Sequence, residues 1–206
     1  MDNRVVWLTG LSGAGKTTIA LAAADRFGCE VLDGDTIRDF FSNTDFSREG
    51  RERHLLGVAR MAKMISKHTP VLCSFITPYE DVRLKILEIL PDNAVMAHVS
   101  TSLEVCEERD AKGLYAKARS GEISNFTGIT DPFDAPECAH LTLDSSGEEG
   151  KSVSELVDQL AHLFEKSKGV LLPGRWQPLH VGHEWLIQQE LDQGKRVIVG
   201  IRDTPP

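Results

Sequence analysis

The chain has 206 residues, of which 41% are hydrophobic and 26% are charged, as expected for a soluble globular protein with room for one full α/β domain and little more. Its net charge is −8, with 31 acidic against 23 basic side chains, and this balance argues against a protein that tracks a nucleic-acid backbone. No stretch approaches the roughly 20 apolar residues needed to span a bilayer, which argues against a membrane protein.

Short apolar runs rich in β-branched residues alternate with longer helix-like patterns over the first 166 residues. Continuously hydrophobic strands joined by helices predict an α/β fold with a parallel sheet that is covered by helices on both faces. Ligands on such sheets bind at the carboxyl ends of the strands, so the loops after the strands should carry the function. The expected strands are 5–9, 30–32, 71–76, 95–99 and 140–143, and the expected helices are 16–27, 48–67, 79–90, 103–111 and 152–166.

A phosphate-binding motif follows the first expected strand. Residues 10–17 read GLSGAGKT and match GxxxxGK[ST] between a strand and a helix, the context that the motif requires. Its glycines let successive amide groups point inward, and the helix N-terminus adds positive dipole character. Lys16 can then reach the β- and γ-phosphates of ATP, and the hydroxyl of Thr17 can ligate Mg²⁺. The predicted ATP-binding residues of this loop are Gly10, Leu11, Ser12, Gly13, Ala14, Gly15, Lys16, Thr17 and Thr18.

The loop after the second strand reads LDGDTIR and favours a kinase over a motor or switch ATPase. It places the carboxylates of Asp33 and Asp35 next to the expected γ-phosphate. One can orient or deprotonate an attacking hydroxyl, and either can act on the water shell of the metal, so that Thr17 and Asp33 are the candidate metal residues. Arg38 is placed to hold an anionic acceptor. The alternative is a plain Asp-Gly turn with a solvated carboxylate.

Four strings resemble the adenylylsulfate kinase family: LDGDTIR, FSREGR (46–51), FITPYEDVR (75–83) and LEVCEERDAKGLYAKARSGEISNFTGITDPFDAP (103–136). The resemblance covers residues 3 to 165. It implies a P-loop NTPase-type fold and the transfer of the ATP γ-phosphate to the 3′-hydroxyl of adenylylsulfate, giving 3′-phosphoadenylylsulfate and ADP. It also implies a homodimer and a lid over the nucleotides. The segment from Arg109 to Gly128, which reads as a loop, suits such a lid.

The resemblance implies a role for individual residues. Asp35 would serve the 3′-hydroxyl, Arg38 and Arg51 would clamp the phosphosulfate, and Phe46 and Phe126 would sandwich the purine; the alternative for either Phe is a place in the core. Arg109 and Lys112 would reach the ATP phosphates, unless they belong to a solvated charged surface. The expected acceptor-binding residues are Asp33, Asp35, Arg38, Phe46, Arg51, His54, Ile76, Thr77, Pro78, Leu114 and Phe126, and the expected catalytic residues are Lys16, Asp35, Thr77 and Arg109.

Two departures from the family leave alternatives open. His54-Leu55-Leu56-Gly57 stands where the family usually has Asn followed closely by paired arginines, and Thr77 stands where it usually has Ser. The hydroxyl at position 77 is kept, but a phosphoserine role there is not expected. A kinase of another nucleotide or nucleotide-conjugate 3′-hydroxyl therefore remains an alternative. So does a non-catalytic ATP-binding module, against which the intact Lys16, Thr17, Asp33 and Asp35 speak.

The last part of the chain reads as a second, incomplete unit. Residues 169–206 follow a short linker after a first domain of residues 1–166, and they restart the pattern with strand 170–172, a helix from about 184 and strand 196–201. GRWQPLHVGH (174–183) resembles the GRFQPxHxGH signature of nucleotidyltransferases. The resemblance implies a partial Rossmann-like β-α-β appendage, with too few residues for transferase activity of its own.

The four cysteines lie far apart, without CxxC spacing, so neither a disulfide framework nor a zinc site is expected. The N-terminal sequence enters a strand at once and has no signal-peptide pattern. Together these features predict a cytoplasmic protein.

Overall fold

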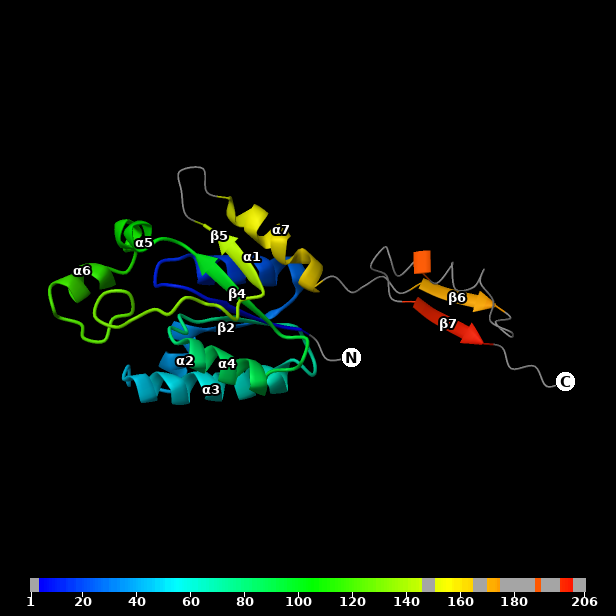
Figure 1. Cartoon of the computed structure of the whole chain (residues 1–206), viewed down its shortest axis with the longest axis horizontal. Helices are drawn as coiled ribbons and strands as arrows, with labels where there is room; N and C mark the ends of the chain where they lie inside the picture. The colour runs from blue at the N-terminus through cyan, green and yellow to red at the C-terminus, as the bar shows by residue number, and fades with distance from the viewer. Residues whose placement is uncertain (1–3, 146–150, 165–169, 175–187, 190–196, 202–206) are drawn as a thin grey trace. The chain divides into compact units, whose positions relative to one another are not determined.

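The computed structural model describes residues 4–145, 151–164, 170–174, 188–189 and 197–201 (Figure 1). The chain divides into two compact units, residues 1–164 and residues 165–206. Among the described helices, none combines the length and the apolar composition that a membrane-spanning segment needs.

The first unit is built on a five-stranded sheet in the order β2-β3-β1-β4-β5. Every pairing in it is parallel, with Val6 of β1 opposite Leu72 of β3 and Val95 of β4. The α/β fold and the parallel sheet predicted from the sequence are therefore confirmed. The strands are β1 (Val5–Thr9), β2 (Glu30–Asp33), β3 (Val71–Ser74), β4 (Val95–Ser100) and β5 (Leu141–Asp144).

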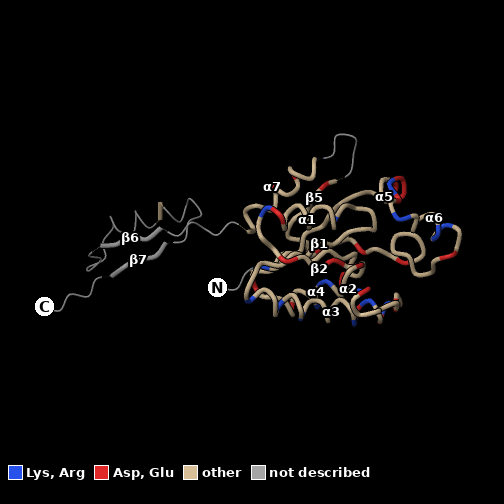
Figure 2. Tube along the Cα trace, turned by 180° about the vertical axis from the view of Figure 1, so that it is seen from behind, with Lys and Arg blue, Asp and Glu red and all other residues tan. Residues whose placement is uncertain are grey.

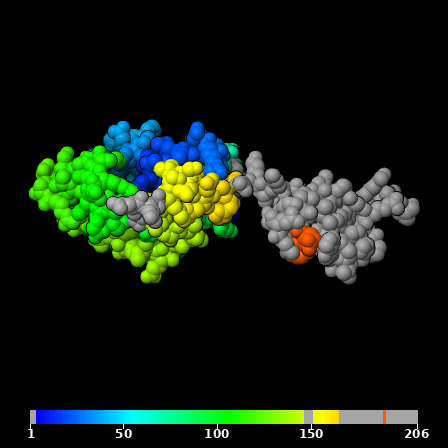
Figure 3. Space-filling view, turned by 90° about the horizontal axis from the view of Figure 1, so that it is seen from above, coloured from blue at the N-terminus to red at the C-terminus, as the bar shows by residue number. Residues whose placement is uncertain are grey.

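Helices cover both faces of this sheet (Figure 1). On one face α1 (Lys16–Phe27) packs against α7 (Val153–Phe164), which the space-filling view shows in yellow beside the blue N-terminal part of the chain (Figure 3). On the other face α3 (Arg48–Ile65) packs against α4 (Glu80–Ile89). Beyond the carboxyl ends of the strands lie α2 (Gly34–Phe40), α5 (Leu103–Arg109) and α6 (Leu114–Arg119).

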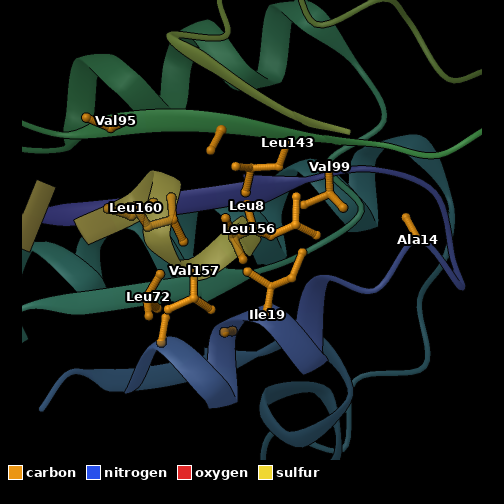
Figure 4. Close-up of a cluster of buried hydrophobic side chains, with 14 of the residues drawn as sticks. Leu8, Ala14, Ile19, Leu72, Val95, Val99, Leu143, Leu156, Val157 and Leu160 are labelled. Carbon is orange, nitrogen blue, oxygen red and sulfur yellow. The ribbon is translucent and has the colours of Figure 1, made fainter. Parts of the chain in front are cut away.

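Two hydrophobic cores follow from the alternation of side chains along β1. Val6 and Leu8 point into a core with α1 and α7, whereas Val5 and Trp7 point into a core with α3 and α4. Each fully buried aliphatic side chain stabilises the fold by about 2 kcal/mol, so both cores hold the ends of β1 firmly in place. Figure 4 shows the first core with Leu8, Ala14, Ile19, Leu72, Val95, Val99, Leu143, Leu156, Val157 and Leu160 labelled.

Two short helices differ from the sequence expectation, which treated both regions as loops. Helix α2 starts directly after Asp33, whose side chain accepts hydrogen bonds from the backbone N–H groups of Asp35 (3.1 Å) and Thr36 (3.4 Å). Helix α6 lies inside the lid segment, residues 109–128. The Asp110 carboxylate accepts hydrogen bonds from Tyr115 N and Ala116 N at its start, both 3.0 Å long. In both cases an aspartate satisfies N–H groups that the first helical turn leaves unpaired.

In the second unit, β6 (Val170–Gly174) and β7 (Val197–Ile201) form a parallel pair, with Val170 opposite Val197. A parallel pair needs a crossover connection rather than a hairpin. Most of that connection, and residues 175–183 of the GRWQPLHVGH motif, lie outside the described residues.

Candidate active site

The carboxyl ends of the sheet open into a cavity of about 580 Å³, a size suited to small-molecule ligands. The P-loop, the ends of β2 and β3, helix α3 and the first residues of the lid segment surround it. The predicted residues that line it are Ser12, Gly13, Gly15, Lys16, Thr17, Thr18, Asp33, Asp35, Arg38, Phe46, Arg51, His54, Ile76, Thr77, Pro78, Arg109 and Lys112.

The P-loop holds its shape through tight backbone packing. A Cβ atom on Gly10 would lie 2.6 Å from the carbonyl oxygen of Val99, so only glycine allows β1 to enter the loop this close to β4. Gly15, with φ +95°, directs the chain into the N-terminus of α1. Leu11 and Ala14 serve this framework and do not line the cavity: Ala14 N donates to Leu11 O, 3.2 Å away.

Lys16 lies buried at the base of the cavity, with 8% of its surface exposed. Its Nζ donates to the carbonyl oxygen of Leu11 at 2.7 Å. Burial, together with the positive charge of Lys112, lowers the pKa of Lys16 to about 8. Because Lys16 is buried, water stabilises its positive charge poorly. A polyphosphate bound in the cavity would stabilise this charge with its own negative charge.

Three oxygen-bearing side chains meet beside Lys16. The Thr17 hydroxyl donates to Asp33 at 2.7 Å and lies 3.3 Å from the hydroxyl of Ser74. Ser74 was missed from the sequence, although it ends β3 directly opposite Asp33 in the neighbouring strand. Hydroxyl and carboxylate oxygens are the ligands that Mg²⁺ prefers, so this group fits the metal expected with ATP.

Asp35 lines the cavity from the first turn of α2 and forms an ion pair with Lys112 of the lid segment. Lys112 was expected at the ATP phosphates. In this structure it contacts the carboxylate that was assigned to the acceptor hydroxyl. Both side chains are more than half exposed, so the pair contributes little to stability and is readily exchanged for other partners.

Arg109, the other basic residue of the lid segment, lies at the P-loop. Its guanidinium donates to the carbonyl oxygens of Gly13 (3.4 Å) and Ser145 (2.9 Å). Figure 2 shows both acidic and basic residues at α5 and basic residues on α6. The lid segment thus brings positive charge to the phosphate side of the cavity.

Two arginines and a phenylalanine form the opposite wall. The guanidinium of Arg38 lies over the ring of Phe46, 4.3 Å from its centre, and that of Arg51 lies 5.6 Å from the same centre. Burial and the neighbouring charge of Arg51 lower the pKa of Arg38 from its ordinary value. Two cations held this close repel each other, and an anion between them would relieve the repulsion.

Arg51 is already committed to several protein oxygens. Its Nε donates to Phe46 O at 2.9 Å, its Nη1 donates to the hydroxyl of Thr127 at 3.1 Å, and its Nη2 donates to Asn125 O. A guanidinium has five N–H donors, so two remain for a ligand. Arg51 thereby ties α3 to the end of the lid segment while it faces the cavity.

His54 follows Arg51 by one turn of α3 and is 8% exposed. Its ring packs edge-on against Phe75, with centroids 6.2 Å apart, and its buried Nε2 has no hydrogen-bond partner among the described residues. Burial and the positive charge of Arg38 lower its pKa from 6.5 to about 4. A buried nitrogen without a partner is costly, and at the wall of a cavity a ligand can satisfy it.

The pKa of His54 predicts a pH-dependent stability. Between pH 6.5 and about pH 4 the unfolded chain binds a proton at this residue and the folded chain does not, so stability falls as the pH falls through this window. We expect the wild type to lose on the order of 1–2 kcal/mol more than the His54→Gln variant between pH 7 and about pH 4.5. Urea unfolding at a series of pH values measures this difference. Parallel losses in the two proteins would contradict it.

Thr77 closes the wall between the arginines and the P-loop. It has a φ of +47°, unusual for a β-branched residue, and its side chain is buried except for 1%. Its hydroxyl accepts a hydrogen bond of 2.9 Å from the indole N–H of Trp7, which leaves the hydroxyl proton free to be donated toward a ligand.

Leu114 and Phe126, both expected at the acceptor, do not line the cavity. Leu114 opens α6 and packs against the first core, and Phe126 is 9% exposed with its ring edge-on to Tyr115, 4.9 Å between centroids. In this conformation both are core residues. Leu55 and Phe75 line the cavity instead; both lie in segments that were compared with the family, but neither was assigned to the site.

The P-loop, the oxygen cluster at Thr17, the carboxylate of Asp35 and the two facing arginines define the class of P-loop kinases. A sequence model of the family described as "Adenylylsulphate kinase" matches residues 2–144. The chain therefore belongs to the adenylylsulfate kinase family, as the motifs of its first 144 residues indicated.

Curated relatives and solved structures agree with this family. The chain is 45% identical over 166 residues to an adenylyl-sulfate kinase of Shewanella baltica, covering 76% of this chain and 80% of the relative. It is 45% identical over 177 residues to a probable adenylyl-sulfate kinase of Aeropyrum pernix, covering 81% and 93%. The Mycobacterium tuberculosis APS kinase, solved in complex with AMPPNP and APS, superposes with a TM-score of 0.73 at 30% identity, covering 80% of this chain and 99% of the other.

Proposed function

We propose that this protein transfers the γ-phosphate of ATP to the 3′-hydroxyl of adenylylsulfate, giving 3′-phosphoadenylylsulfate and ADP. The observation that carries the proposal is that one cavity joins a P-loop lysine to a carboxylate and a pair of facing arginines. The P-loop lysine suits the triphosphate of ATP. The carboxylate and the two arginines suit an acceptor that carries a hydroxyl group and a phosphosulfate. The relatives at 45% identity carry the same activity in their names.

On the ATP side, residues 10–18 would bind the triphosphate, with Lys16 and Arg109 neutralising charge on the transferred group. Thr17 and Asp33 would hold Mg²⁺, which supplies charge neutralisation at the phosphate oxygens when bound. The oxygen cluster of Thr17, Asp33 and Ser74 is the observation that supports this assignment. Phosphoryl transfer needs positioning and electrostatic stabilisation more than covalent chemistry, so a direct in-line transfer is the simplest mechanism.

On the acceptor side, Asp35 would orient the 3′-hydroxyl and take its proton as the new P–O bond forms. Lys112 forms an ion pair with Asp35 in this structure, and it would move to the ATP phosphates when these offer a stronger negative charge. Arg38 and Arg51 would hold the phosphosulfate, with His54 donating to it from Nε2 and Thr77 from its hydroxyl. Ile76, Thr77 and Pro78 would form the wall behind the sugar.

Phe46 would stack on the adenine of the acceptor from the arginine side. The family pattern assigns Phe126 to the other side of the base and Leu114 beside it. Because both pack in the core in this structure, that assignment requires the lid segment to rearrange when the acceptor binds. The lid segment would at the same time exclude water from the transferred phosphate.

The missing arginine pair, one reason to consider an alternative acceptor, becomes a weaker reason in the structure. Of residues 55–57, which stand where the family usually has its paired arginines, only Leu55 lines the cavity. His54 does line it and remains the residue that favours the alternative, a kinase of another nucleotide 3′-hydroxyl. The second alternative, an ATP-binding module without transfer, requires the paired carboxylates and arginines to serve no acceptor.

An ADP-release assay with a panel of acceptors separates these functions. We expect ATP turnover that depends on adenylylsulfate at micromolar concentration and that adenosine 5′-phosphate does not replace. Turnover with a different 3′-hydroxyl nucleotide alone would support the alternative kinase, and no acceptor-dependent turnover would support the non-catalytic module.

Removing one arginine of the acceptor wall should separate the two substrates. We expect Arg38→Met to raise the KM for adenylylsulfate by about 30-fold or more, since a charge-assisted hydrogen bond contributes about 1.5–3 kcal/mol, while the KM for ATP stays unchanged. Arg53→Met, at an exposed arginine of α3 that does not line the cavity, is the matched control. Equal KM values for adenylylsulfate in wild type and Arg38→Met would remove Arg38 from the acceptor site.

We further propose that the protein is a cytoplasmic homodimer, as the family pattern implies; one solved relative, from Thiobacillus denitrificans, is described as a hexameric APS kinase. Light scattering on the purified chain distinguishes these assemblies. For residues 169–206, separate from the proposed kinase domain of residues 1–166, we propose a nucleotidyltransferase-like segment. The parallel pairing of β6 and β7 supports a β-α-β arrangement.

A further inference from the structure

Arg83, on the first turn of α4, has no exposed surface at all. A guanidinium stays charged at any pH that a protein tolerates, so its burial is costly unless the charge and all its donors are matched. The residue lies outside the lining of the cavity and has no part in the function proposed above. Its surroundings indicate what it does.

All five N–H donors of Arg83 have an acceptor. Nε donates to Thr77 O (2.9 Å), one Nη donates to Glu80 (2.6 Å) and Ala135 O (3.4 Å), and the other donates to Pro78 O (3.1 Å) and Asp134 O (2.9 Å). Four of these five acceptors are backbone carbonyl groups. The guanidinium therefore holds four main-chain carbonyl groups in place, in addition to its ion pair with Glu80.

The carbonyl groups belong to two segments that are far apart in the sequence. One is the wall of the cavity at Thr77 and Pro78, and the other is residues 134–135, which follow the lid segment on the way to β5. Further bonds hold the same junction: Asp134 N donates to Pro78 O (2.8 Å) and Glu80 N donates to Asp134 (3.0 Å). The ring of Phe133 lies under the guanidinium, 4.9 Å from ring centre to Cζ.

The wall that Arg83 holds is strained. The positive φ of Thr77 costs about 1–3 kcal/mol for a non-glycine residue and persists only where the surroundings enforce it. Its carbonyl oxygen accepts from Arg83 Nε and from the hydroxyl of Thr9 at 3.3 Å, and its own hydroxyl accepts from Trp7. Arg83 thus supplies one of the bonds that hold the backbone of Thr77 in this conformation at the cavity wall.

We propose that Arg83 is a positioning residue for phosphoryl transfer, which fixes the Thr77–Pro78 wall against the acceptor and couples that wall to residues 134–135, which follow the lid segment. The inference rests on the proposed function. A well-packed apolar side chain would stabilise the fold at least as well as a buried ion pair, but it could not hold four carbonyl groups in place. The role is therefore geometric. It acts on the acceptor rather than on ATP, because the hydrogen bonds of Arg83 go to residues 77–80 and 134–135 and not to the P-loop.

Arg83→Lys tests this role because it keeps the charge and reduces five donors to three in a different geometry. We expect the KM for adenylylsulfate to rise about 10-fold and kcat to fall by a similar factor, since sub-ångström misplacement of a reacting group has effects of this size. The KM for ATP should stay within about two-fold, because Arg83 donates no hydrogen bond to the P-loop itself. Glu80→Gln, in which Arg83 keeps its carbonyl partners but loses its counter-charge, should shift the acceptor KM in the same direction by a smaller factor.

Leu160→Ala, in the core between α1 and α7, is the control for lost stability. It should lower the melting temperature without separating the two KM values. If Arg83→Lys also lowers the melting temperature without separating the two KM values, Arg83 is structural only and the inference is overturned. If Arg83→Lys does not fold, the same result for Glu80→Gln overturns the inference. A wild type that does not turn over adenylylsulfate would overturn the proposed function instead, so the two failures are distinguishable.

Discussion

Replacing Asp35 with Asn is expected to reduce kcat by about 1,000-fold, because a positioned general base contributes roughly 10²–10⁴-fold to a proton transfer. The carboxylate lies in the cavity on α2, and Asn keeps its shape without its basicity. ATP should bind with its affinity unchanged within about three-fold, since the P-loop keeps its contacts. Pre-steady-state measurement of 3′-phosphoadenylylsulfate formation, together with ATP titration, tests both parts.

Two controls make this result specific. Asp39→Asn alters an exposed carboxylate one turn further along α2, outside the cavity, and should turn over like the wild type. Lys112→Met removes the ion-pair partner of Asp35 and leaves the carboxylate in place, so its kcat should fall less than that of Asp35→Asn. An Asp35→Asn enzyme as fast as Asp39→Asn would show that another group accepts the proton.

Replacing Lys16 with Met is expected to weaken ATP binding by about 100-fold, in line with the loss of a charged hydrogen bond in a buried site. The rate should fall as well, because the lysine also stabilises charge on the phosphate during transfer. Folding should survive, since Lys16 is buried and Met removes the need to bury a charge. Isothermal titration with a non-hydrolysable ATP analogue measures the affinity for ATP. Lys63→Met, at an exposed lysine of α3, is the control and should bind the analogue like the wild type.

The pH dependence of ATP binding provides a second test of Lys16. Its pKa of about 8 in the free protein means that the residue loses its proton as the pH rises above this value. The KM for ATP should therefore rise above pH 8 in the wild type and stay flat in Lys16→Met over the same range. Identical profiles in the two proteins would assign the titration to another group.

The ATP half of the site could be predicted from the sequence because its information is local. GLSGAGKT is contiguous, and its context of strand, turn and helix can be recognised from neighbouring residues alone. Lys16 and Thr17 line the cavity as expected. The parallel sheet was predictable for the same reason, since buried strands are continuous hydrophobic runs.

The rest of the site depends on contacts between distant parts of the chain. Ser74 reaches Thr17 across 57 positions, and Arg83 meets Asp134 across 51, so no pattern of spacing indicates either contact. Arg51 and Phe46 were assigned through family motifs, whereas Arg38 was first assigned from its place in the loop after the second strand. The motifs do not indicate the contacts of these side chains. The structure shows that Arg51 donates three hydrogen bonds to protein oxygen atoms.

The two missed helices have a common cause. At Asp33 and Asp110 a single side chain caps a short helix, and an Asp-Gly or Lys-Gly sequence nearby reads as a turn by composition. The expectation for Leu114 and Phe126 followed the family pattern, whereas burial of both residues is decided by tertiary packing with Tyr115 and the first core.

The destination of the γ-phosphate is the most direct measure of the proposed function. When the protein is given ATP, Mg²⁺ and adenylylsulfate, phosphorus NMR should show a new 3′-phosphomonoester formed in equal amount to ADP, and the 3′-deoxy analogue of the acceptor should yield neither. Release of inorganic phosphate alone, or equal ADP formation with the 3′-deoxy analogue, would contradict the transfer to a 3′-hydroxyl.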